Sequence, residues 1–520
     1  MLRSVVATTP AIPNDLAFDA AEFERAFSAA DFDRCRQLVE GRRGFEAVLA
    51  GTRVAIRERR YMDIIEALSE RPKGPHEARI ARDVMLGAAL ALTRDYVGGR
   101  RLIERALGEM SAANPWYYDA IHYRGLIAWI TQQYEQADEA ASLQLESLSP
   151  NVRGRARILL SWIALRRGKI LGQVDELQKA LDEFDSTDSP DQYLRASALV
   201  TLALLCREMP LREVGDRVRS IFDSLPWTSA LQRERFQATR FVAGLDELDG
   251  NELAAFGGFR KAAKLAPSDH WSILCSLDRA QLARSTGEPV FAMEQLQEAH
   301  ELAQRISWNE ATGEERAALL VLAQLFAYDE PAIAEQYLAR YRTLSSSVIP
   351  IVSYATDPRV KGFESYSQGV AWLRLGDVEE GTAALTEAWS IFEDFNYEWR
   401  AALCALALFE ATNDRRWIQR AVAKIEPWPH SWIARRVTEV KNNSNLRLQK
   451  IPPAKRRILE LVRAGKRNSE IASILGRSPN TVRNQLSELF QTFDVKSRGE
   501  LVAALSKPVA PLTVLADRRR

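Results

Sequence analysis

The sequence has few cysteines, and those it contains form no metal or disulfide pattern. Cys35, Cys206, Cys275 and Cys404 lie far apart, and no two of them are spaced as C-x-x-C. This spacing argues against both a zinc site and a disulfide framework. Each cysteine lies in an apolar stretch with helical periodicity, so we expect four buried, chemically inert thiols.

Long apolar runs are also missing. The longest, such as residues 401–409, fall well short of the roughly 20 residues that cross a bilayer. The N-terminal segment, MLRSVVATTPAIPN, lacks the continuous apolar stretch of a secretory signal. We therefore expect a cytoplasmic protein with no membrane partner.

Residue patterns typical of catalysis are absent. The five histidines are dispersed along the chain. A phosphate-binding loop needs Ser or Thr after Gly-Lys, but the Gly-Lys pairs at Gly168 and Gly465 are followed by Ile170 and Arg467. The sequence therefore predicts no enzyme, no catalytic residues, no cofactor and no metal site.

The net charge of +1 conceals a division between two parts of the chain. Residues 446–520 contain 16 basic and 6 acidic side chains, a net charge of +10, which leaves −9 for the residues before them. A concentrated positive field favours a polyanion through counterion release, although a run of charge is more often a solvated surface. A further hypothesis is that the acidic body covers the basic segment until a signal arrives.

Residues 18–440 have the pattern of a helical repeat. Amphipathic helical segments alternate with short polar or Pro/Gly turns, and no strand pattern interrupts them. Two turns are followed by small and large apolar residues at equal offsets: Ala255, Phe259 and Ala262 after Gly250, and Gly381, Leu385 and Ala388 after Gly376. Parts of this pattern recur after Arg94, Gln132, Gly168 and Gly287.

Small residues at these positions let two helices approach closely, while the large ones fill the adjacent gaps. The pattern resembles the tetratricopeptide repeat, and we expect eight to ten units. Stacked units form a superhelix whose concave face usually binds a peptide, a protein segment or a second copy of the chain.

Two aromatic clusters in the repeats have two interpretations. The first contains Trp116, Tyr117, Tyr118, His122 and Tyr123, and the second contains Trp372, Trp389, Trp399, Trp417, Trp428 and Trp432. Either cluster could line a ligand groove, but core packing between repeats is the more frequent use of such residues.

The C-terminal part starts a new domain. Residues 441–450, KNNSNLRLQK, lose the helical periodicity and predict a linker. Four short helices are expected over residues 451–507: one from Pro452 and Pro453 to Gly465, one from Asn468 to Gly476, one from Pro479 to about Phe493, and one from Ser497 to about Leu505. Ser478 is placed to cap the third helix, and Ser497 with Glu500 forms a capping-box pattern for the fourth.

The third of these helices has two different faces. Its apolar stripe consists of Val482, Leu486, Leu489, Phe490 and Phe493, and its polar face consists of Asn480, Arg483, Asn484, Ser487 and Gln491. Arg and Asn can form bidentate hydrogen bonds with guanine and adenine, so this helix has the features of a recognition helix for the major groove. Basic residues nearby in the sequence could neutralise phosphates: Lys455, Arg456, Arg457, Lys466, Arg467, Lys496 and Arg498.

The segment resembles the helix-turn-helix of the LuxR family of bacterial transcription regulators over about 55 residues. The matching residues are Gly465, Asn468, Glu470, Ile471, Ala472, Leu475, Ser478, Thr481, Val482, Arg483, Val495, Ser497, Arg498, Glu500, Leu501 and Val502. The sequence departs from the family pattern at Gln485, where a histidine is usual, at Thr492, and at Lys455 and Arg457. These departures affect sequence preference and phosphate register.

The resemblance implies that Arg483, Asn484 and Ser487 face bases, and that Asn468, Ser469, Thr481 and Lys496 lie near phosphates. It also implies that the fourth helix pairs two domains on a near-palindromic site. The full set of expected DNA-binding residues is Asn468, Ser469, Ser478, Asn480, Thr481, Val482, Arg483, Asn484, Ser487, Lys496 and Arg498.

The sequence thus predicts an all-α protein, a tetratricopeptide-like solenoid followed by a four-helix LuxR-type helix-turn-helix domain, with flexible ends at 1–17 and 508–520. The predicted function is sequence-specific regulation of transcription, with the repeats as sensor, oligomerisation or partner-binding platform. The expected partners are duplex DNA, RNA polymerase, a second copy of the chain, and a protein, peptide or small-molecule effector on the repeats. The alternative is an interaction scaffold whose C-terminal bundle only dimerises.

Overall fold

A computed structural model describes residues 18–42, 44–69, 75–286, 288–308, 313–327, 330–346, 358–449, 458–459, 461–462, 465–493 and 495–501. Every regular element among these residues is helical, and none of these helices is long and apolar enough to cross a membrane. The predicted all-α fold is therefore confirmed. The ends predicted as flexible, 1–17 and 508–520, lie outside the described residues.

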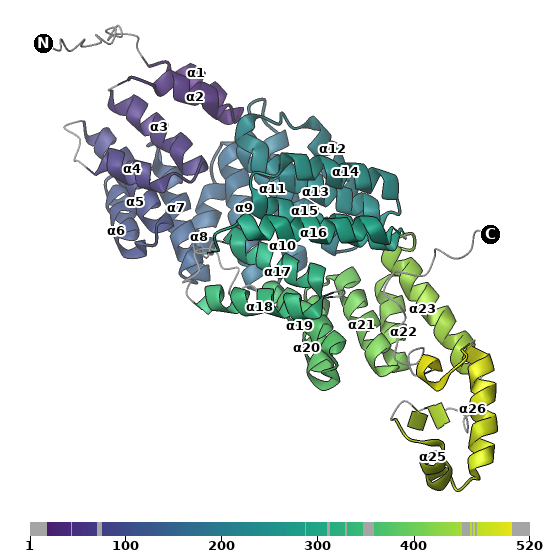
Figure 1. Ribbon diagram of the computed structural model, residues 1–520. Coiled ribbons are helices and arrows are strands. Elements are labelled where there is room, and N and C mark those ends of the chain that lie inside the picture. Colours follow the sequence, from purple (N-terminus) through teal and green to yellow (C-terminus); the bar gives the residue numbers. More distant parts are fainter. Residues whose placement is uncertain are drawn as a thin grey trace, which may run out of the picture.

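The helices of the repeat body follow one another in pairs (Figure 1). Their bounds are α1 (Ala20–Ser28), α2 (Phe32–Val39), α3 (Phe45–Arg57), α4 (Tyr61–Leu68), α5 (His76–Leu92), α6 (Tyr96–Gly108), α7 (Tyr117–Ile130), α8 (Tyr134–Leu145), α9 (Pro150–Arg166), α10 (Ile170–Asp185), α11 (Gln192–Glu208), α12 (Arg212–Ser224), η1 (Ser229–Leu231), α13 (Gln232–Leu248), α14 (Glu252–Leu265), α15 (Asp269–Ser285), α16 (Pro289–Arg305), α17 (Gly313–Phe326), α18 (Pro331–Ser346), α19 (Pro358–Leu375), α20 (Val378–Asp394), α21 (Glu398–Thr412), α22 (Arg415–Lys424) and α23 (Trp432–Gln449). The described residues thus contain eleven pairs, α1/α2 to α21/α22, where eight to ten were expected.

The turn within each repeat has a recurring hydrogen-bond pattern. Five of the turn residues predicted from the sequence, Arg94, Gln132, Gly168, Gly250 and Gly376, have a left-handed backbone conformation, and Gly287 lies outside the described residues. After each of the five, the next N–H donates to the carbonyl five residues earlier, at 2.7–2.9 Å. This bond satisfies a carbonyl that the helix end leaves unpaired and fixes the reversal of the chain.

Small residues hold the paired helices close together, as the sequence predicted. A Cβ atom added at Gly87 would lie 2.9 Å from the Gly99 carbonyl oxygen of the neighbouring helix, and one added at Gly369 would lie 3.0 Å from the Gly381 carbonyl oxygen. The large members of the pattern, Phe259 and Leu385, are fully buried. The body is therefore a tetratricopeptide-like solenoid.

The four cysteines are buried and none forms a disulfide. Burial raises the pKa of Cys35, Cys206 and Cys275 to about 12 and also raises that of Cys404. These thiols stay protonated near neutral pH and are poor nucleophiles, because the thiolate is the reactive form.

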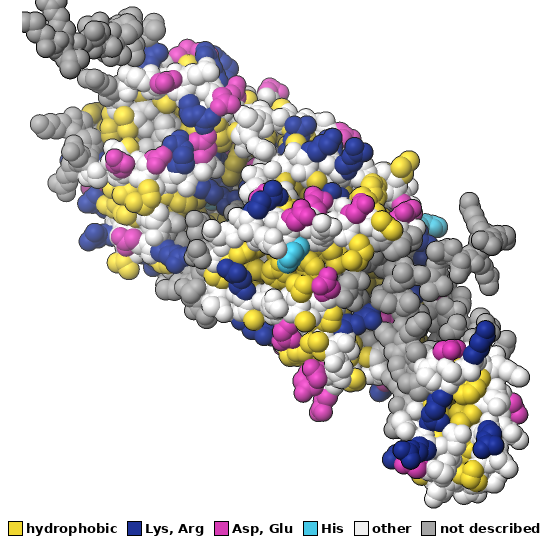
Figure 2. All heavy atoms as spheres, viewed as in Figure 1, with side chains coloured by type: hydrophobic (Ala, Val, Ile, Leu, Met, Phe, Trp, Pro, Cys, Tyr) yellow, Lys and Arg dark blue, Asp and Glu magenta, His cyan; other side chains and the backbone are white. Residues whose placement is uncertain are grey.

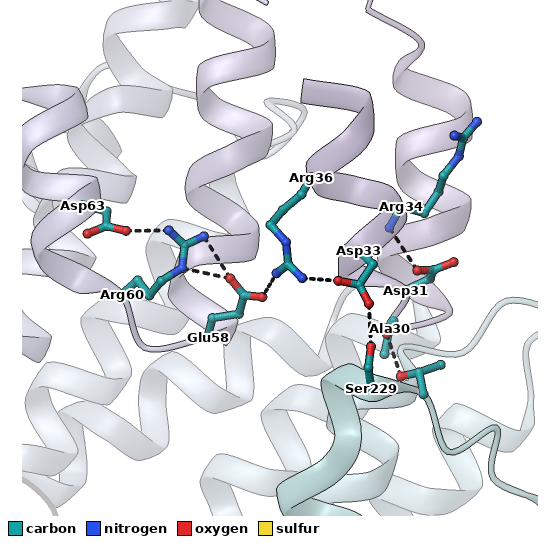
Figure 3. A network of polar contacts seen from close by, with 10 residues as sticks. Ala30, Asp31, Asp33, Arg34, Arg36, Glu58, Arg60, Asp63 and Ser229 are labelled. Atoms are coloured by element: carbon teal, nitrogen blue, oxygen red, sulfur yellow. Dashed lines mark hydrogen bonds and ion pairs between the residues drawn. The ribbon is translucent and has the colours of Figure 1, made fainter. Parts of the chain in front are cut away.

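The N-terminal helices contact the middle of the chain through a polar network (Figure 3). Arg36 on α2 bridges Asp33 and Glu58, and the Ser229 hydroxyl donates to Asp33 at 2.7 Å. Ser229 and Arg36 together lower the pKa of the Asp33 carboxyl. The pair Arg57 and Asp191, 2.7 Å apart, makes a second link between α3 and the start of α11.

The last helices of the body also contact its middle repeats. Arg400 on α21 forms two hydrogen bonds with Glu208 at the end of α11, at 2.7 and 2.8 Å. Arg435 on α23 pairs with Glu252 on α14. A Cβ at Gly250 would lie 2.8 Å from the His430 carbonyl oxygen, so the chain just before α23 approaches the α13–α14 turn closely.

The linker predicted at 441–450 is largely helical instead. Helix α23 runs without interruption from Trp432 to Gln449, and residue 450 lies outside the described residues. The segment contains no Gly or Pro, and its Asn and Ser residues weaken a helix without ending it. The body and the C-terminal domain are thus joined by a helix through most of this segment.

Candidate nucleic-acid interface

The C-terminal domain has a small hydrophobic core of its own. Its buried residues are Ile458, Leu459, Val462, Ile471, Ala472, Val482, Leu486, Leu489 and Leu501, and the core of the repeat body contains none of them. Residues 458–459, 461–462 and 498–501 are helical and belong to the expected first and fourth helices, whose remaining residues are not described. This core fixes the orientation of the two helices that are described in full.

The first of these two helices is α25 (Asn468–Leu475). The Glu470 carboxylate accepts a hydrogen bond from the Arg467 N–H at 2.6 Å, and this bond, with the charge of Lys466, lowers the pKa of Glu470. At the other end, Gly476 has a left-handed conformation, and the Arg477 N–H donates to the Ala472 carbonyl at 2.9 Å. The turn after α25 is therefore as tightly defined as those in the body.

The second is α26 (Pro479–Phe493), which has the bounds that the sequence predicted. The Ser478 hydroxyl accepts a hydrogen bond from the Thr481 N–H at 3.1 Å, so Ser478 caps the helix as expected. Along the predicted apolar stripe Val482, Leu486 and Leu489 are at most 3% exposed. Burial of this stripe leaves the opposite side of the helix facing solvent.

The predicted recognition residues lie on that exposed side. Asn480, Arg483, Asn484, Ser487 and Gln491 are all exposed, and the Ser487 hydroxyl donates to the Arg483 carbonyl at 3.2 Å. Among the predicted phosphate-contacting residues, Ser469, Thr481 and Lys496 are also exposed. The structure thus brings Arg and Asn side chains together on one solvent-facing strip.

Val482 differs from the other predicted DNA-binding residues in its burial. Its side chain is fully buried in the core of the domain, where it positions α26. The reason is its place in the apolar stripe one helical turn before Leu486, which directs its side chain away from the exposed face.

Asn468 and Arg498 contact each other. Arg498 donates to the Asn468 side-chain oxygen at 2.8 Å and also to the Lys466 carbonyl, and both side chains are half-buried. These bonds join the start of the fourth helix to the start of α25. Glu500 caps the same region, since its carboxylate accepts from the Lys496 N–H at 2.7 Å and its own N–H donates to the Ser497 hydroxyl at 3.1 Å.

The interface is electropositive. Lys466, Arg467, Arg477, Arg483 and Lys496 are exposed on the described part of the domain. Figure 2 shows such basic side chains gathered on the domain at the lower right. Two acids lie nearby, Glu470 and Glu500. Their carboxylates accept backbone hydrogen bonds at the starts of helices.

A contact that the sequence did not reveal joins the turn to the recognition helix. Arg477 donates to the Gln485 side-chain oxygen at 2.9 Å. Gln485 stands eight residues later, and its departure from the family pattern gave no indication of which residue it contacts. Neither residue was among the predicted site residues.

The aromatic clusters of the body pack against their neighbours. In the first, Trp116 and Tyr123 border a hydrophobic core, and burial lowers the pKa of His122 well below its usual value, reinforced by Arg155 and Arg57. In the second, Trp399 and Trp428 are buried. Core packing is therefore the interpretation that the structure favours. The described residues contain no cluster of His, Cys, Asp and Glu suited to a metal ion.

Comparison with known proteins agrees with this division of the chain. Residues 454–505 match the family described as "Bacterial regulatory proteins, luxR family". No curated protein matches the chain. The C-terminal domain is thus a luxR-type helix-turn-helix domain.

Solved structures resemble the chain at low identity. "Crystal Structure of Rap Protein Complexed with Competence and Sporulation Factor" is 11% identical, with 69% of this chain and 99% of that one covered and a TM-score of 0.38. "Crystal structure of APC/C hetero-tetramer Cut9-Hcn1" is 13% identical, with 80% and 87% covered and a TM-score of 0.29. Scores of this size assign no partner to this chain.

Proposed function

We propose that this protein is a sequence-specific DNA-binding regulator of transcription, and that α26 enters the major groove of its target. One observation carries the proposal: α26 exposes Asn480, Arg483, Asn484, Ser487 and Gln491 along one side while its opposite side is buried. The match of residues 454–505 to the luxR family supports the same function.

The dimensions and chemistry of α26 suit the groove. A helix of 15 residues is about 22 Å long, and its diameter of about 10–12 Å fits the major groove of B-DNA, which is about 12 Å wide. Arg483 can donate two hydrogen bonds to guanine, and Asn484 can pair with the edge of adenine. These two residues are therefore the proposed base-reading pair, with Ser487 beside them.

The residues around α26 are proposed to position the domain on the phosphates. Ser469, Thr481 and Lys496 are exposed hydroxyl and ammonium groups of the kind that contact DNA backbones. Asn468 and Arg498 have a different proposed role, because their mutual hydrogen bond holds the fourth helix against α25. They support the surface and contribute a smaller share of the contacts.

The repeat body is proposed to act as the sensor or partner-binding platform. Helix α23 supports this role, because it contacts α15, α21 and α22 of the body and runs to Gln449, just before the DNA-binding domain. A change in the arrangement of the repeats would therefore move the end of α23 and, with it, the C-terminal domain. A second copy of the chain, RNA polymerase and a repeat-bound effector remain predicted partners.

A buried ionic cluster supports this coupling. Arg207 on α11 pairs with Asp278 on α15 at 2.6 Å, and both side chains are at most 4% exposed. Glu208, the next residue, pairs with Arg400 on α21. Helices from the middle and the end of the body thus share one network of charges, which breaks only at a high energetic cost.

The proposed function is tested with the full-length protein and duplex DNA. Sites are first selected from a random-sequence library at low salt, and affinities of variants for the selected site are then compared. We expect Arg483→Ala and Asn484→Ala each to cost about 1–3 kcal/mol of binding and to relax the preferred sequence. The matched control is Arg416→Ala, which removes an exposed arginine of α22 that is paired with Asp414, and should leave binding unchanged.

The same experiment distinguishes a regulator from a scaffold. A scaffold whose C-terminal domain only dimerises would enrich no sequence and would show equal, weak DNA binding in all four proteins. Such a result would remove the proposed function, since both base-reading substitutions lie on an exposed face and leave the core intact.

A further inference from the structure

Arg477 is an exposed arginine whose backbone is fixed on both sides. Its N–H donates to the Ala472 carbonyl at 2.9 Å, which closes the turn after α25. The following residue, Ser478, caps α26. The Cα of Arg477 is therefore held rigidly at the point where the chain enters the recognition helix.

The residue type at this position is unusual for the turn. In a helix end of this kind, the residue that makes the closing hydrogen bond commonly packs an apolar side chain against the last turn of the helix. Here the position carries an arginine that is exposed. A cation thus stands where an apolar side chain would ordinarily stabilise the turn.

The side chain of Arg477 is also anchored. One of its terminal nitrogens donates to the Gln485 side-chain oxygen at 2.9 Å. A guanidinium has five N–H donors, so this bond leaves others available to a ligand. Among the described residues, no ion pair joins Arg477 to a carboxylate. Within the described part of the domain, its charge is therefore not paired with an acid.

The place of the anchor indicates which part of DNA it meets. Gln485 is half-buried and follows the exposed Asn484 around α26, so it lies at the flank of the exposed face. The sugar-phosphate strands border the groove on the flanks of an inserted helix. A guanidinium held at that flank faces phosphates, whereas the bases lie beyond the middle of the exposed face.

From these contacts, and resting on the proposed function, we infer that Arg477 binds a DNA phosphate and that Gln485 is its positioning residue. The hydrogen bond to Gln485 orders the arginine before DNA arrives, which reduces the conformational entropy lost on binding. Phosphate contacts set the register of a protein on the duplex. The pair thus fixes how Arg483 and Asn484 are presented to the bases.

The test uses the full-length protein and a duplex that carries the sequence selected by the wild type from random DNA. Affinity is measured over a series of KCl concentrations for wild type, Arg477→Ala, Gln485→Ala and the double variant. We expect Arg477→Ala to weaken binding about tenfold. The slope of log affinity against log salt should fall by about 0.9, the value for one lost phosphate contact on B-DNA.

Gln485→Ala isolates the positioning role. It keeps the charge, so the salt slope should stay near that of the wild type while affinity falls about threefold, by loss of the ordering hydrogen bond. The double variant should bind no more weakly than Arg477→Ala alone, since Gln485 acts through the arginine. Arg477→Lys should restore the salt slope, and Arg416→Ala, in the body, serves as the control for net charge.

Three results would overturn the inference. An unchanged salt slope and affinity in Arg477→Ala would show that the arginine does not touch DNA. A changed preferred sequence in that variant, with little change in slope, would make it a base-reading residue. If the losses of affinity are additive in the double variant, Gln485 does not act through Arg477. If the wild type selects no sequence, the proposed function itself is wrong, and that outcome is visible before any variant is made.

Discussion

The repeat body and the C-terminal domain use arginine in opposite ways. In the body, Arg207 is buried and Arg400 is half-buried, and both are paired with carboxylates from other helices. In the C-terminal domain, Arg477 and Arg483 are exposed. Removing one partner of a buried ion pair destabilises the fold, because it leaves an uncompensated buried charge. An exposed cation, in contrast, can bind an external anion such as a DNA phosphate.

Charged side chains thus have two different roles in this chain. The buried ion pairs of the body connect helices that are distant in sequence, and the exposed basic residues of the C-terminal domain are proposed to bind DNA. Substitutions in the two regions should therefore affect different measurements: stability for the body, and DNA affinity with its salt dependence for the domain.

The largest effect is expected from Asp278→Ala. Burial alone would raise the pKa of the Asp278 carboxyl, but Arg207 and Arg240 together lower it, so the residue is ionised between two cations. Its removal leaves Arg240 without this carboxylate and leaves Arg207 beside the more distant Glu247 carboxylate, at 3.9 Å, which should reduce the free energy of unfolding by about 3–5 kcal/mol. Urea unfolding followed by circular dichroism measures the loss.

The control for this substitution is Asp175→Ala, which breaks the pair with Lys179 at the surface of α10, where the side chains are 58% and 43% exposed. The expected cost is below about 0.5 kcal/mol. If both substitutions cost the same, the buried cluster is not the main ionic contribution to the stability of the body.

A pH dependence of stability is expected from Glu247. Burial raises its pKa to about 7, against the effect of Arg207, with Asp278, Arg400 and Trp432 also facing it. Because the folded state holds its proton more tightly than the unfolded state, Glu247 favours folding most at low pH. This contribution is lost as the pH rises from about 4.5 towards 7, by up to about 3 kcal/mol.

Glu247→Gln should flatten that part of the stability curve, because the amide does not titrate. Unfolding midpoints in urea between pH 5 and pH 8 compare the two proteins. If the stability of the variant changes with pH as steeply as that of the wild type, the pH dependence arises from other groups and not from Glu247.

A smaller and more local effect is expected from Gly476→Ala. Gly476 has a φ of 61°, where an L side chain is strained by roughly 1–2 kcal/mol, although no atom crowds the added Cβ. Hydrogen exchange at the Ile471 and Val482 amides should accelerate, while exchange in the body stays unchanged. Faster exchange in α21 or α23 as well would show that the two cores unfold together.

The local features of the fold were predictable from the sequence because they depend on neighbouring residues. Turn chemistry at Gly476 and Ser478 gave the bounds of α25 and α26, and the spacing of apolar residues gave the buried face of α26. The repeat turns were found in the same way, although Arg94 and Gln132 adopt a conformation more typical of glycine.

Long-range contacts were not predictable, because they depend on how many repeats stack and at what angle. No local pattern links Arg57 to Asp191 or Glu208 to Arg400 across more than a hundred residues. The polar composition of residues 441–450 predicts a linker, whereas α23 continues to Gln449 because no Gly or Pro ends it. Within the site, the apolar stripe of α26 implies the burial of Val482, whereas the contact of Arg477 with Gln485 depends on side-chain conformations that no sequence pattern specifies.

Selection of duplex DNA from a random library by the full-length protein is the decisive test of whether α26 reads DNA sequence. The account predicts that the wild type and Arg416→Ala enrich the same sequence at low salt, and that a variant carrying both Arg483→Ala and Asn484→Ala loses that preference while remaining folded. Enrichment of the same sequence by that double variant, or of no sequence by the wild type, would contradict the assignment of α26 as the helix that reads DNA.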